Sequence, residues 1–179
     1  LGVVELTVTL HYLLDTPRNL GDFSLLDHRG KPFEATSLEG GWTLVFFGFT
    51  HCPDVCPTTL TQLKVVVNKL GEDADKVQVL LVTVDPERDT LRTMGPAVTA
   101  IHPELVGLTG NETALQQAYD AFQVQKSLVY THPEEGPIYA HGSFIYLLAP
   151  DGSFKTLFPP VLSPSRIAET TLSYIKGDR

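Results

Sequence analysis

The sequence predicts an α/β fold in which helices flank a mixed central β-sheet. Two apolar, β-branched runs, "WTLVFFGF" (42–49) and "VQVLLVTVD" (77–85), have the length of strands and lack polar alternation, which is typical of strands buried on both faces. Between them, the leucines and valines of 58–70 recur at helical spacing, and the run stops at Gly71, a residue that commonly ends helices. This strand–helix–strand order predicts two parallel neighbouring strands.

The second half of the chain continues the same alternation. The turn signal Asp151–Gly152 lies between two apolar runs and indicates a hairpin. The expected elements are a helix over 90–101, a strand over 105–110, a helix over 111–124, a hairpin over 143–158 and a closing helix over 165–176. A mobile insertion loop is predicted over 132–142, before the last strand pair. We expect residues 1–18 to be an N-terminal extension or linker and 19–179 to be one domain.

Composition excludes some classes of function. The chain has 179 residues, 42% of them hydrophobic, and a formal net charge of -8, which suits one compact domain. No basic cluster is visible in the sequence, so we expect no nucleic-acid partner. The apolar opening run 1–14 is interrupted by polar residues and is too short to span a bilayer. Because the chain begins at Leu1, we expect any membrane anchor to lie upstream of it.

The stretch "FGFTHCPDVCP" (47–57) contains both cysteines of the chain, Cys52 and Cys56. It follows a predicted buried strand and precedes a helix, which places the pair at the carboxyl edge of the sheet, where α/β folds carry their sites. A helix start favours thiolates. The pair could fill space, form a structural disulfide, act as a redox couple or bind a metal. The three-residue spacer is longer than the two of thioredoxin-type redox pairs, and two thiolates with one imidazole suit Cu(I).

A metal site of this kind needs a histidine. Of the candidates, His141 is the best choice because it precedes the predicted strand 143–150, whose amino end can face the cysteine loop. His51 is adjacent to Cys52, but neighbouring side chains usually point in different directions. The remaining histidines are expected on the surface: His11, His28, His102 and His132.

Three motifs in order, "FGFTHCPDVCPTTL", "VTVDPERDT" and "YAHGSFIYLLAPDG", closely resemble the Sco/SenC family of copper-binding cytochrome c oxidase assembly proteins. The resemblance extends over about Gly21 to Lys176. It implies a thioredoxin-like fold and copper, as Cu(I) and in a second form Cu(II), held by Cys52, Cys56 and His141. It also implies that the protein delivers copper to the binuclear copper centre of oxidase subunit II, or reduces the cysteines of that centre.

The resemblance further implies a cellular location and partner proteins. Members face the bacterial periplasm, usually tethered to the inner membrane, or the mitochondrial intermembrane space. Other copper chaperones and thioredoxin-like reductants are expected as further partners, and the chain is expected to be a monomer. One position departs from the family, because Ala140 stands where members often carry an aspartate.

Two aspartates are candidates for supporting the site. Asp85 ends the strand before "PERDT"; it could lie near the ligands or serve only as a turn residue beside Pro86. Asp54 lies between the cysteines and could tune the pKa of their thiols or be solvated.

The leading hypothesis is a copper metallochaperone that passes its metal on by ligand exchange. The alternative is a thiol-disulfide oxidoreductase, and both activities could belong to one protein, so whether the chain is an enzyme stays open. In either case the cysteines could rest as a disulfide that must be reduced before copper binds. A third reading, a peroxiredoxin-like peroxidase, rests on Thr50 two residues before Cys52.

Overall fold

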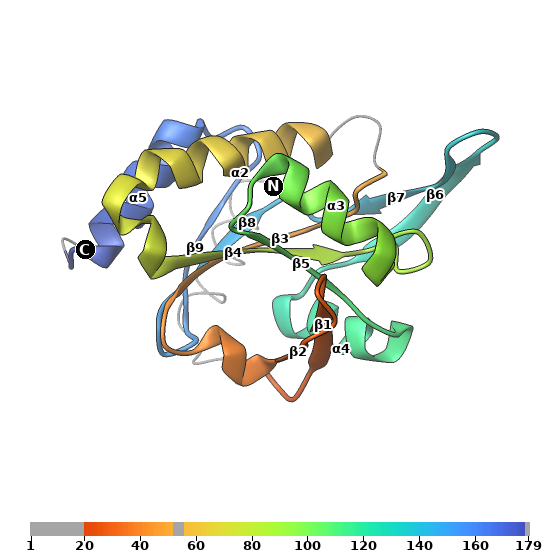
Figure 1. Ribbon diagram of the computed structural model, residues 1–179, viewed down its shortest axis with the longest axis horizontal. Helices are drawn as coiled ribbons and strands as arrows, with labels where there is room; N and C mark the ends of the chain where they lie inside the picture. Colours follow the sequence, from red (N-terminus) through yellow and green to blue (C-terminus); the bar gives the residue numbers. More distant parts are fainter. Residues whose placement is uncertain (1–19, 52–55, 178–179) are drawn as a thin grey trace, which may run out of the picture.

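The computed structural model describes residues 20–51 and 56–177, with the backbone alone for 56–58. In the described residues, a layer of β-sheet lies between helices on its two faces (Figure 1). None of the helices in this part combines the length and the apolar character that a membrane crossing needs. The predicted extension 1–18 lies outside the described residues.

Seven strands of the described chain form the central sheet in the order β2-β1-β5-β4-β3-β8-β9. β3, β4 and β5 run parallel, while β8 and β1 flank them antiparallel, so the predicted mixed sheet is confirmed. The strands are β1 (Ser24–Asp27), β2 (Pro32–Glu34), β3 (Trp42–Gly48), β4 (Val77–Thr83), β5 (Leu105–Thr109), β8 (Ile145–Leu148) and β9 (Phe154–Phe158).

Four α-helices of the described part cover this sheet, with α2, α3 and α5 on one face and α4 on the other (Figure 1). A side chain fixes the start of α4: Asn111 accepts a hydrogen bond from the Ala114 amide at 2.8 Å, an N-cap that satisfies an otherwise unpaired donor. α2 ends at Leu70 as predicted, but Gly71 opens a short 3-10 helix. The helices are α2 (Cys56–Leu70), α3 (Leu91–Ile101), α4 (Glu112–Phe122) and α5 (Pro164–Ile175), with the 3-10 turns η1 (Ala35–Leu38) and η2 (Gly71–Lys76).

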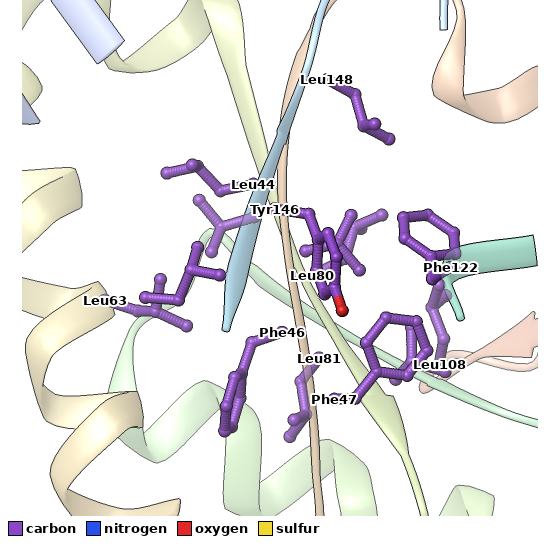
Figure 2. Packing of buried hydrophobic residues seen from close by; sticks show 14 of the residues in the cluster. Leu44, Phe46, Phe47, Leu63, Leu80, Leu81, Leu108, Phe122, Tyr146 and Leu148 are labelled. Atoms are coloured by element: carbon purple, nitrogen blue, oxygen red, sulfur yellow. The ribbon is translucent and has the colours of Figure 1, made fainter. Parts of the chain in front are cut away.

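The core fills both faces of β3 because neighbouring side chains on a strand point to opposite sides. Phe46 lies on the side of Leu63, whereas Phe47 faces Phe122 (Figure 2). Phe47 is fully buried, and its ring centroid lies 5.1 Å from that of Phe122 and 6.0 Å from that of Tyr146. This packing makes β3 a rigid support for whatever follows its carboxyl end.

The segment 132–142, which was predicted to be an insertion loop, belongs to a β-hairpin that begins earlier, at Lys126. Its strands β6 (Lys126–His132) and β7 (Gly136–His141) pair antiparallel in a sheet of their own. This segment contains Pro133 and Pro137, and a proline cannot donate a hydrogen bond to a strand ladder. Pro137 nevertheless pairs with Thr131, since a two-stranded ribbon has open edges where a missing N–H is tolerated. The hairpin projects beyond the central sheet (Figure 1).

Candidate metal centre

The segment that carries the cysteines connects β3 to α2. β3 ends at Gly48, and α2 begins at Cys56, so the connection leaves the carboxyl end of a central strand, as the sequence predicts. The start of α2 places backbone N–H groups near Cys56, and such groups favour a thiolate. Cys52, Asp54 and the side chain of Cys56 lie outside the described residues.

His141 lies over the end of β3, against the rings of Phe46 and Phe49. Its ring centroid is 6.1 Å from that of Phe46 and 5.9 Å from that of Phe49, both with edge-to-face geometry. Phe49 stands three residues before Cys52. The structure therefore brings this histidine, the last residue of β7, to the strand that leads into the cysteines.

The surroundings of His141 favour the neutral form of its imidazole. Its Nδ1 lies 3.0 Å from the carbonyl oxygen of Gly142; a carbonyl can only accept, so Nδ1 carries the proton and the lone pair is on Nε2. Burial lowers the pKa of His141, an effect that the hydrogen bond to Gly142 partly opposes. A neutral ring oriented by a hydrogen bond through one nitrogen is the form in which histidine binds metals.

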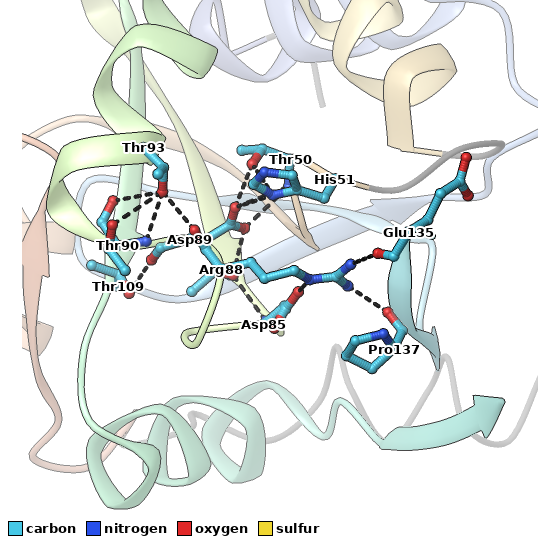
Figure 3. Close-up of polar contacts among 11 residues, drawn as sticks. Thr50, His51, Asp85, Arg88, Asp89, Thr90, Thr93, Thr109, Glu135 and Pro137 are labelled. Carbon is cyan, nitrogen blue, oxygen red and sulfur yellow. Dashed lines mark hydrogen bonds and ion pairs between the residues drawn. The ribbon is translucent and has the colours of Figure 1, made fainter. Parts of the chain in front are cut away.

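A buried carboxylate fixes the start of the cysteine segment. Asp89 is fully buried and accepts hydrogen bonds from the Thr50 amide at 3.0 Å and from the Thr83 hydroxyl at 2.7 Å. The Thr50 hydroxyl also donates to it, and His51 Nδ1 lies 3.4 Å away, as Figure 3 shows. Sequence analysis did not single out Asp89, although its place in the "DPERDT" motif was a signal.

The same motif contacts the hairpin that ends in His141. The fully buried carboxylate of Asp85 accepts a hydrogen bond from Arg88 Nε, while its backbone oxygen accepts from the Asp89 amide at 2.9 Å. Asp85 is thus a turn residue that also orients the Arg88 side chain. The other guanidinium nitrogens of Arg88 donate to the backbone oxygens of Glu135 and Pro137 (Figure 3).

The other histidines of the described part bind nearby backbone groups. His28 Nδ1 accepts a hydrogen bond from the Gly107 amide at 3.1 Å, and burial, with a smaller effect of Arg29, lowers the pKa of His28. His102 and His132 each accept from the amide two residues ahead. His11 lies outside the described residues. Ala140 is exposed on β7, so a carboxylate at this position would lie at the surface.

Known proteins are similar in sequence to this chain over most of its length. A family model described as SCO1/SenC matches residues 13–176. Protein SCO2 homolog, mitochondrial, from Bos taurus is 40% identical over 161 residues, which cover 89% of this chain and 60% of that protein. The SCO2-like protein of Rickettsia felis is 35% identical over 160 residues, covering 88% of this chain and 76% of that protein. The chain thus spans about 60% of the length of the mitochondrial relative.

The fold is shared as well. The structure of Bradyrhizobium japonicum ScoI with copper bound superposes with a TM-score of 0.79 at 38% sequence identity, over 86% of this chain and 98% of that one. The expected thioredoxin-like fold is confirmed. With a family model that matches nearly all of the sequence and relatives in both mitochondria and bacteria, the chain belongs to the SCO1/SenC family.

Proposed function

We propose that this chain is a copper metallochaperone that binds one Cu(I) ion through Cys52, Cys56 and His141. The observation that carries the proposal is the position of the His141 imidazole, which lies against Phe49 at the end of β3, the strand that leads into the cysteines. A family relative has been solved with copper bound. Two thiolates and one neutral imidazole form a soft, low-coordinate donor set that suits Cu(I).

The recipient in this proposal is the binuclear copper centre of cytochrome c oxidase subunit II. Transfer proceeds by ligand exchange: the thiolates of the recipient displace Cys52, Cys56 and His141 one at a time, so that the ion does not pass through water. The chain acts as a monomer, and other copper chaperones or thioredoxin-like reductants load or reduce it. Cu(II) is a second form that the imidazole can help to hold.

The proposed location is the one that the family resemblance implies. We place the domain in the bacterial periplasm, tethered to the inner membrane by a segment upstream of it, with the mitochondrial intermembrane space as the alternative. Relatives occur in both kinds of source.

A second candidate function is thiol-disulfide exchange at the oxidase copper site. The observation in its favour is the position of Cys56 at the first residue of α2, since a helix start stabilises a thiolate. One thiolate of the pair attacks a disulfide of the recipient and forms a mixed disulfide. The second cysteine then resolves it, which leaves a Cys52–Cys56 disulfide and two reduced thiols on the recipient.

Copper affinity separates the two functions. Reduced protein is titrated anaerobically with Cu(I) in competition with a chromophoric chelator, for wild type, His141→Ala, Cys52→Ser and Cys56→Ser. His102→Ala is the matched control, because His102 binds only a local turn amide among the contacts described. We expect one copper per wild-type chain, an affinity at least about tenfold lower in His141→Ala, a greater loss in the serine variants and no change in the control.

Reduction of a model disulfide is measured on the same proteins. The metallochaperone proposal expects His141→Ala to keep thiol exchange while it loses copper. Equal copper affinity of wild type and His141→Ala would overturn the proposed ligand set and leave thiol exchange as the function.

A further inference from the structure

One short turn, residues 85–89, contacts both segments that carry the proposed copper ligands. Its Asp89 carboxylate holds Thr50, two residues before Cys52. Its Arg88 guanidinium holds the backbone at the tip of the hairpin that ends in His141. The two ligand-bearing segments are far apart in sequence, so this turn is a mechanical link between them.

The hairpin depends on such links for its position. β6 and β7 pair with each other, and in the described part neither strand joins the central sheet. No ladder of hydrogen bonds therefore fixes the hairpin to β3. Apart from its short connection to β8, which begins at Ile145, its contacts to the central sheet, among those described, are made by side chains: the rings of Tyr139 and His141 lie 6.0 and 5.9 Å from that of Phe49, and Arg88 binds the tip.

All three guanidinium nitrogens of Arg88 donate hydrogen bonds, one within the turn and two to the hairpin. Nε donates to the Asp85 carboxylate, Nη1 to the Glu135 carbonyl and Nη2 to the Pro137 carbonyl. The guanidinium carbon also lies 5.5 Å from the centre of the Phe49 ring. Such a divergent, planar set of donors is specific to arginine, because a lysine ammonium is a single point charge on a flexible stem.

The backbone opposite Arg88 is shaped to receive it. Gly136 has a φ of +80°, a conformation that favours glycine, and a Cβ added there would lie 3.1 Å from Arg88 Nη1. The glycine thus allows the guanidinium to reach the carbonyl oxygens on both sides of it. The contact therefore depends on the identity of both residues, a glycine at position 136 and an arginine at position 88.

We propose that Arg88 is a positioning residue that holds the β6–β7 hairpin, and with it His141, against the end of β3 where the cysteine segment begins. The inference rests on the proposed copper function. Arg88 touches no copper ligand side chain in the described part; it acts by keeping the imidazole in the place where Cys52 and Cys56 can share an ion with it. Without this contact the hairpin samples other positions, and the apparent affinity falls by the fraction of time that His141 is in place.

Two substitutions test whether Arg88 positions the hairpin. Arg88→Lys keeps the positive charge beside Asp85 but cannot bind both carbonyls, and Arg88→Gln removes the charge as well. Arg166→Lys is the control, because Arg166 is an exposed arginine of α5 that pairs with Glu169 at 3.5 Å. We expect the affinity for Cu(I) to fall about fivefold in Arg88→Lys and to stay unchanged in the control.

A second mutation shows whether Arg88 works through the histidine. In the His141→Ala background, Arg88→Lys is expected to cause no additional loss of copper affinity, whereas a general structural defect would lower affinity in both backgrounds. Such a double-mutant cycle isolates the coupling between the two side chains.

A readout without copper completes the test. Amide hydrogen exchange of the copper-free, reduced protein is expected to speed up over residues 126–141 in Arg88→Lys, with the α2 and α5 amides unchanged. Wild-type protection of the hairpin in Arg88→Lys, or equal copper loss in both backgrounds, overturns the inference. If wild type and His141→Ala bind copper equally, the proposed function falls, and hydrogen exchange alone decides whether Arg88 holds the hairpin.

Discussion

Replacing Asp89 by alanine tests whether its buried carboxylate holds the segment that leads to the cysteines. Asp89 is fully buried and accepts three close hydrogen bonds, from the Thr50 amide, the Thr50 hydroxyl and the Thr83 hydroxyl. A hydrogen bond to a charged group contributes about 1.5–3 kcal/mol. The Thr50 amide cannot rotate away, whereas both hydroxyls can turn to other acceptors. We therefore expect Asp89→Ala to lower the free energy of unfolding by about 4 kcal/mol, which is less than the sum of the three hydrogen bonds.

The assay is urea unfolding of the reduced, copper-free protein, followed by circular dichroism. Asp89→Asn keeps one acceptor oxygen and turns an NH2 group toward the donors, so it is expected to lose about half as much stability, about 2 kcal/mol. Asp73→Ala is the control: Asp73 pairs with Lys76 at the surface, at 2.6 Å, and its variant should keep the wild-type midpoint. A loss below about 1.5 kcal/mol for Asp89→Ala would refute the anchoring role.

Three further predictions concern the fold around the site. Burial lowers the pKa of His28 from 6.5, so the unfolded chain binds more protons at this residue than the folded one. The contribution of neutral His28 to the free energy of unfolding should therefore be complete above about pH 6.5 and be lost as the pH drops. His28→Gln should weaken this pH dependence, measured as urea midpoints between pH 7.5 and 5.5. Phe47→Ala removes a fully buried ring and should lower the free energy of unfolding by about 4 kcal/mol, while Leu128→Ala, at a side chain 58% exposed, should change it by less than about 0.5 kcal/mol. Gly136→Ala should speed hairpin hydrogen exchange, because its φ of +80° disfavours alanine; unchanged exchange would contradict the shape argued for this turn.

The parts of the fold that local pattern determines were predictable from the sequence. The apolar runs of β3 and β4, the helical spacing of α2 and the Asp151–Gly152 turn each encode their structure within a few residues. The hairpin was not predicted, because its strands are mostly exposed or half-buried and lack the alternation of apolar and polar residues that signals a strand with one buried face. His141 was chosen as a ligand because it precedes a predicted strand and because of the family resemblance; its role as a copper ligand stays a prediction.

The supporting residues of the site were harder to predict. Arg88 binds backbone 47 and 49 residues further along the chain, and Asp89 binds Thr50, 39 residues before it. Contacts at such separations are created by the tertiary fold, and no periodicity in the sequence signals them. Asp85 was selected for its place at the end of a strand, yet its partner Arg88 was not considered.

X-ray absorption of the Cu(I)-loaded protein tests the central claim most directly, because it counts the atoms bound to the ion. Wild type and His141→Ala are loaded with one equivalent of Cu(I) under anaerobic conditions and measured side by side. We predict two sulfur neighbours and one nitrogen neighbour in wild type, with the nitrogen lost in His141→Ala. A nitrogen neighbour that persists in His141→Ala, or a wild-type site without nitrogen, would contradict the proposed ligand set.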